Sequence, residues 1–77
     1  MERYKVLIRE SAVGGLERLP EKDLRRAFPR IRGLAAELRP RDCEKLSAQE
    51  RYRIRQGDYR IVYEVDDDGR EVVVAKI

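Results

Sequence analysis

Four closely spaced arginines carry the chemistry that this chain is best equipped to perform. Residues 51–65 read R-Y-R-I-R-Q-G-D-Y-R-I-V-Y-E-V, and the arginines are Arg51, Arg53, Arg55 and Arg60. Guanidinium groups stay charged and present planar forks of donors that fit phosphate oxygens. In an RNA-cleaving site, such groups would hold the scissile phosphate and stabilise the negative charge that builds up in the transition state.

The composition excludes several other kinds of chemistry. Histidine is absent, which removes the usual general base, the Ser-His and Cys-His nucleophile pairs, and histidine metal ligands. Any catalysis must therefore use arginine, lysine, tyrosine or carboxylates, and we expect no metal and no cofactor. Cys43 is the only cysteine, so no intrachain disulfide can form, which fits a reducing cytosol.

Charge is distributed unevenly over a short chain. The 77 residues make one domain, 43% of them are charged, and the net charge is only +3. Like charges on neighbouring strands repel each other, so a cluster of arginines is most easily understood if an anionic partner is expected. Phosphate backbones and acidic protein segments both fit, and a solvated face that only protects a sheet edge is the plain alternative.

Nothing in the sequence predicts a membrane segment. No apolar run approaches the roughly 18 residues that a membrane-spanning helix needs, and no signal-peptide core is present. We therefore expect a cytoplasmic protein with no membrane partner.

The arginines must be positioned by a β-hairpin. Apolar and aromatic residues alternate with them, and alternation with a period of two is typical of a strand with one buried face. The residues expected to face the core are Tyr52, Ile54, Tyr59, Ile61, Tyr63 and Val65. The arginines should then share the opposite face with Val62 and Glu64 alone.

The remaining elements can be placed around this hairpin. We predict a strand at residues 3–9, a first helix capped by Ser11 and ended by Pro20, a second helix at 22–38, a loop to Gln49 and a last strand at 71–77. Pro29 should kink or restart the second helix. The order β-α-α-β-β-β predicts one α+β domain over residues 1–77, with an N-terminal helical hairpin packed on a small antiparallel sheet.

The chain resembles the RelE/ParE toxin superfamily. The resemblance rests on Ala12-x-x-x-Leu16-x-x-Leu19-Pro20, on Tyr52-Arg53-Ile54-Arg55, on Gly57-Asp58-Tyr59-Arg60-Ile61-Val62-Tyr63 and on Val72-Val73-Val74. It implies the toxin of a type II toxin–antitoxin system, of the kind associated with plasmid stabilization, which a cognate antitoxin neutralises.

The resemblance also implies an activity and roles for individual residues. RelE-like members cut messenger RNA on the ribosome, so Arg53 and Arg55 would contact the RNA phosphate and Arg60 would stabilise the transition state. Arg51 has no firm counterpart, and we assign it to general contact with RNA or antitoxin. Two alternatives remain: a ParE-like inhibitor of DNA gyrase, and an inactive homologue that only binds an antitoxin.

The end of the chain departs from the family pattern. In the family the last strand is usually followed by a glycine, a basic residue and then a tyrosine, of which the last two contribute to the active site. The sequence here ends with Ala75-Lys76-Ile77. We therefore expect the site to lack these two contributions.

Overall fold

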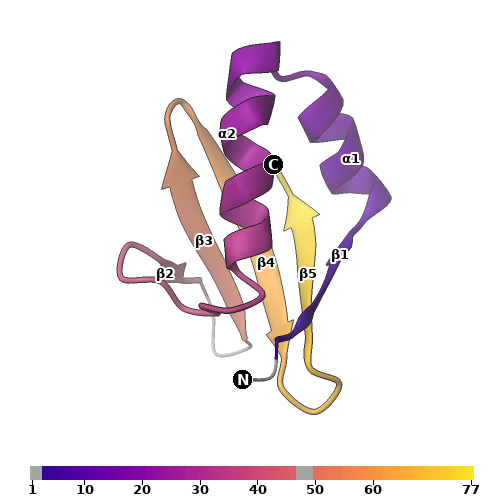
Figure 1. Ribbon diagram of the computed structural model, residues 1–77, viewed down its shortest axis with the longest axis vertical. Coiled ribbons are helices and arrows are strands. Elements are labelled where there is room, and N and C mark those ends of the chain that lie inside the picture. Colours follow the sequence, from indigo (N-terminus) through magenta and orange to yellow (C-terminus); the bar gives the residue numbers. More distant parts are fainter. Residues whose placement is uncertain (1–2, 47–49) are drawn as a thin grey trace.

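Among the residues that the structure describes, a mixed five-stranded sheet has two helices on one face and no helix on the other (Figure 1). The computed structural model describes residues 3–46 and 50–77. The helices are α1 (Glu10–Glu17) and α2 (Glu21–Gly33). The strands are β1 (Lys5–Ile8), β2 (Glu44–Lys45), β3 (Arg51–Gln56), β4 (Tyr59–Asp66) and β5 (Glu71–Lys76), and their order across the sheet is β1-β5-β4-β3-β2.

The core lies between the helices and the inner face of the sheet. Of the residues predicted to face the core from the hairpin, Tyr52, Ile54, Ile61, Tyr63 and Val65 are buried, and Tyr59 is partly buried against the core. The predicted alternation is therefore confirmed. The other buried residues come from β5 and the helical segment: Val72, Val74, Ala12, Leu16, Ala27, Ile31 and Leu34. Gly57 takes a left-handed φ of 61° in the turn between β3 and β4, which glycine adopts without a steric penalty.

The predicted α+β class and order of elements are confirmed, but the sheet is not wholly antiparallel. β1 pairs with β5 in parallel, from Lys5 opposite Glu71 to Ile8 opposite Val74. β5 runs antiparallel to β4 and lies between β4 and β1 in the sheet, where it has the same direction as β1. Alternating patterns look alike in parallel and antiparallel strands, so the sequence could not show this.

A further strand, β2, lies in the segment predicted as a loop. It has two residues and pairs with β3, so it is too short to produce a hydrophobic period. The last part of the predicted loop, up to Gln49, lies outside the described residues. Cys43, in the same segment, is partly buried against the core.

The helix ends differ from the predictions. Arg9, not Ser11, occupies the N-cap of α1, and the Ser11 hydroxyl instead donates to the backbone oxygen of Ala75 over 2.7 Å. Helix α2 continues through Pro29 without restarting, since Ala27 and Ile31 on either side are anchored in the core. It ends at Gly33, several residues before the predicted end. Neither helix combines the length and the apolarity that crossing a membrane would require.

Candidate functional site

The outer face of the sheet brings the four predicted arginines together. In the β3–β4 register, Arg51 lies opposite Glu64, Arg53 opposite Val62, and Arg55 opposite Arg60. Tyr52, Ile54 and Ile61, which alternate with them along the strands, are buried on the inner face, so the arginine side chains stand on the face that the helices leave bare. The four differ in whether a carboxylate pairs with them, which the sequence did not reveal.

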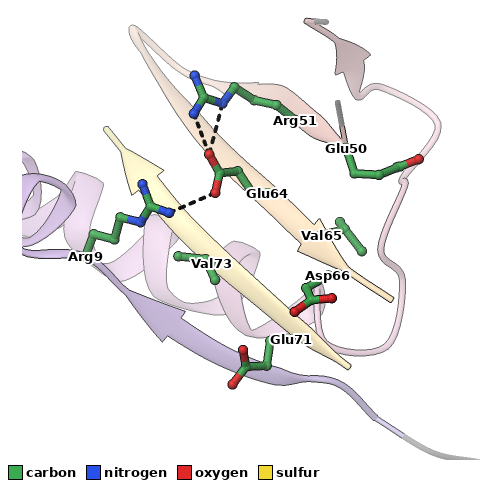
Figure 2. Close-up of a pocket in the computed structure, with 8 residues that line it drawn as sticks. All are labelled: Arg9, Glu50, Arg51, Glu64, Val65, Asp66, Glu71 and Val73. Carbon is green, nitrogen blue, oxygen red and sulfur yellow. Dashed lines mark hydrogen bonds and ion pairs between the residues drawn. The ribbon is translucent and has the colours of Figure 1, made fainter. Parts of the chain in front are cut away.

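Arg51 is held by Glu64. Its Nε and Nη2 lie 3.1 and 2.5 Å from Oε2 of Glu64, and the second carboxylate oxygen accepts from Nη2 of Arg9 over 3.0 Å (Figure 2). Glu64 is thus shared by two guanidinium groups, one from β3 and one from the residue after β1. This arrangement neutralises part of the positive charge at this end of the sheet. The predicted contact of Arg51 with RNA remains a prediction, and it would require competition with Glu64.

Arg53 also has an acidic partner. Strand β2 places Glu44 directly opposite Arg53, and the two side chains form an ion pair at the surface. The side chain of Arg53 is 31% exposed, against 62% for that of Glu44. Surface ion pairs of this kind contribute only about 0–1 kcal/mol, so an incoming phosphate could replace the carboxylate at little cost.

Arg55 and Arg60 form the least neutralised part of the face. Both are exposed, they sit directly opposite each other, and neither makes an ion pair within residues 3–46 and 50–77. Together with Gly57, Asp58 and Tyr59 they line an open hollow of about 280 Å³ beside the turn. Two adjacent guanidinium groups with no ion-pair partner among the described residues are suited to a phosphate group, whose charge offsets their mutual repulsion.

A second hollow, of about 430 Å³, extends this surface towards β5. Its lining includes Arg53, Arg60 and Lys76. Lys76 was not among the predicted site residues, and regular alternation along β5 would turn its side chain to the same side as Val74.

The opposite end of the outer face is acidic. A hollow of about 320 Å³ at this end has a lining that includes the carboxylates of Glu50, Glu64, Asp66 and Glu71. Figure 2 draws these side chains. Hydrogen bonds from Tyr52 and then from Arg39 hold the pKa of Glu50 below its usual value. Within the described part of the chain, no group of three or more potential ligands is arranged to hold a metal ion.

The tyrosines are committed to structure. Their hydroxyls donate to Asp67 (from Tyr4), to Glu50 (from Tyr52), to the Asp23 backbone oxygen (from Tyr59) and to the Leu38 backbone oxygen (from Tyr63). Burial raises the pKa of both Tyr59 and Tyr63, and the hydrogen bond to Asp67 raises that of Tyr4. The outer face that carries Arg51, Arg53, Arg55 and Arg60, called the arginine face below, can therefore bind anions and stabilise developing charge. These tyrosines are poorly placed to transfer protons there.

A protein-family model matches most of the chain. Residues 6–77 match the family described as the ParE toxin of the type II toxin–antitoxin system parDE. No curated protein resembles the chain closely enough in sequence to count as a match.

Solved structures share the fold over nearly the whole length. The archaeal RelE–RelB complex from Pyrococcus horikoshii OT3 superposes with a TM-score of 0.84 at 29% identity, covering 96% of this chain and 91% of the relative. The toxin–antitoxin complex RelBE2 from Mycobacterium tuberculosis gives 0.82 at 28% identity, with coverages of 99% and 90%. The intact E. coli RelBE complex gives 0.83 at 20% identity, with coverages of 95% and 92%, and at this identity only the fold is comparable.

Proposed function

The chain belongs to the ParE toxin family of type II toxin–antitoxin systems, within the RelE/ParE superfamily, and we propose that it cuts messenger RNA on the ribosome. One observation carries the proposal. Arg55 and Arg60 present two exposed guanidinium groups, side by side and without an ion pair in the described residues, on a sheet face that no helix covers. A surface of this kind matches a phosphodiester better than it matches an apolar protein segment.

The proposed roles follow from the position of each arginine. Arg53 and Arg55, two residues apart on β3, grip the RNA backbone on either side of the scissile phosphate. Arg60 faces Arg55 across the hairpin and stabilises the charge that develops on the phosphate as it is cleaved. Guanidinium groups are poor bases, so catalysis depends on positioning of the substrate and on electrostatics. In this proposal the ribosome aligns the substrate.

A cognate antitoxin is the proposed protein partner. The relatives from P. horikoshii, M. tuberculosis and E. coli were solved as toxin–antitoxin complexes. A 77-residue chain has a small core, so a partner that binds only the folded toxin raises its stability by mass action. The proposed reaction, together with its control by the antitoxin, takes place in the cytoplasm, where the ribosomes are.

Inhibition of DNA gyrase is a second candidate function. It is favoured by the family model, whose description names ParE rather than RelE. This function would require a protein-binding surface and no chemistry, so it makes different demands on the arginine face.

Ribosomes programmed with a defined messenger RNA separate these possibilities. We expect the wild-type protein to produce discrete cleavages and Arg60→Gln to lower the single-turnover rate by about 10²–10³-fold, which is typical for loss of one group that stabilises transition-state charge. Arg25→Gln is the matched control, because Arg25 lies on α2 and pairs only with Glu21 among the described residues. Circular dichroism verifies that each variant is folded.

The results that would contradict the proposal are equally specific. An uncut message, or equal rates for wild type and Arg60→Gln, would refute the nuclease mechanism. Inhibition of purified gyrase with the messenger RNA left intact would support the second candidate. Antitoxin binding without either effect would identify an inactive homologue.

A further inference from the structure

The end of β5 contains a β-bulge that changes where its last side chains point. From Asp66 opposite Glu71 to Tyr63 opposite Val74, the β4–β5 register advances one residue at a time. The next pair is Val62 with Lys76, so Ala75 is an extra residue on β5 with no counterpart on β4. A bulge of this kind alters the side on which the following residues lie.

Lys76 reaches the outer face because of this bulge. Val72 and Val74 are fully buried on the inner face, and regular alternation would place Lys76 beside them. The extra residue instead pairs Lys76 with Val62, which lies between Arg60 and Glu64 on the outer side. The side chain of Lys76 then lines the same hollow as Arg53 and Arg60.

Contacts with the start of α1 hold the bulged register. The Ser11 hydroxyl donates to the backbone oxygen of Ala75 over 2.7 Å, and the backbone NH of Arg9 donates to the oxygen of Val74 over 3.0 Å. Beyond the bulge, Ile77 packs so closely on Gly15 that a Cβ there would come within 2.8 Å of the Ile77 Cβ. The bulge is therefore anchored from both sides by α1 and the residue before it.

We propose that Lys76 is a further phosphate-binding residue of the arginine face, and that Ser11 is a positioning residue that keeps it there through the bulge at Ala75. The proposal rests on the proposed function, since it adds a contact to the same RNA site. An ammonium group is a compact charge that can contact a phosphate oxygen from many directions, and Lys76 makes no ion pair within the described residues.

Salt-dependent RNA binding tests Lys76 directly. A fluorescein-labelled single-stranded RNA ten nucleotides long would be titrated by anisotropy at several salt concentrations. Loss of one phosphate contact should lower the slope of log K against log salt by about 0.7, which weakens binding about fivefold at 0.1 M salt. We expect this effect for Lys76→Gln and near-normal binding for Lys76→Arg. The matched control is Lys22→Gln, which removes the same charge from an exposed site on α2.

Ser11→Ala tests the positioning role. It should weaken binding by about the same factor as Lys76→Gln, and the double variant should be no weaker than Lys76→Gln alone, because Ser11 acts only through Lys76. Cross-strand NOEs between residues 62 and 76 report the register independently of RNA. If Ser11→Ala leaves RNA affinity unchanged, the positioning role is refuted.

The outcomes separate this inference from the proposed function. If Lys76→Gln behaves like Lys22→Gln while Arg60→Gln weakens binding, Lys76 is not part of the site but the site stands. If Lys76→Gln lowers the slope and ribosome-bound messenger RNA is not cut, the inference holds and the nuclease function fails. If the wild-type protein binds no free RNA, this inference is overturned, and cleavage of ribosome-bound messenger RNA still tests the proposed function separately.

Discussion

Two adjacent glycines in α1 should respond to alanine substitution in opposite directions. Glycine in a helix interior costs about 1 kcal/mol relative to alanine, so both substitutions gain the same helix propensity. At Gly14 an added Cβ meets nothing within 4 Å, and nothing offsets that gain. We expect Gly14→Ala to raise the free energy of unfolding by about 0.5–1 kcal/mol.

Gly15→Ala instead meets Ile77, the residue after β5. Its Cβ would lie 2.8 Å from the Cβ, 3.3 Å from the backbone oxygen and 3.5 Å from the Cα of Ile77. These atoms belong to the backbone or are bonded to it, so rotation of a side chain cannot relieve the contact. Overpacking of this kind costs about 1–3 kcal/mol, which leaves a net destabilisation of up to about 2 kcal/mol after the gain in helix propensity.

Thermal unfolding followed by circular dichroism measures both effects. For a chain of this size, 1 kcal/mol corresponds to about 4–8 °C in Tm, so the two variants should shift Tm in opposite directions. Urea titrations at 25 °C should place them in the same order. A Gly15→Ala variant as stable as Gly14→Ala would refute the close packing of Ile77 on α1, and with it one support of the bulge.

Three further outcomes follow from the hydrogen bonds and ion pairs. Tyr63→Phe should lower the free energy of unfolding by about 0.5–1.5 kcal/mol in urea titrations, because it removes the part-buried hydrogen bond from the Tyr63 hydroxyl to the Leu38 oxygen; an unchanged midpoint would contradict this. Burial raises the pKa of Tyr63, so the folded protein retains a proton that the unfolded chain loses at about pH 10. The free energy of unfolding should therefore fall as pH rises above that value. Urea titrations from pH 9 to 11 measure this fall, and Tyr63→Phe should reduce it; an equal fall in the variant would assign the effect to other groups. Glu64→Gln should strengthen RNA binding, because it releases Arg51 and Arg9 from their ion pairs. Arg51→Gln should then weaken RNA binding more in the Glu64→Gln background than in wild type, and a double-mutant cycle measures this coupling. Absence of the coupling would exclude Arg51 from the site.

The sequence alone determined which face of the hairpin carries the arginines. A period of two is a property of the strand backbone, so burial of Tyr52, Ile54, Ile61 and Tyr63 obliges their neighbours to face outward. The order of elements and the α+β class followed from similarly local signals. The side of a residue relative to its strand neighbours needs no knowledge of distant contacts.

Only the tertiary structure decided how strongly each arginine is neutralised and which residue joins them. Glu64 reaches Arg51 through the register of β3 on β4, and Glu44 reaches Arg53 through a two-residue strand too short to leave a pattern. The parallel pairing of β1 with β5 and the bulge that turns Lys76 outward depend on contacts with segments more than 60 residues away, such as that of Ser11 with Ala75. Local periodicity specifies the direction of a side chain within a regular strand, whereas its charge partners and any irregularity of the strand depend on what the rest of the chain places beside it.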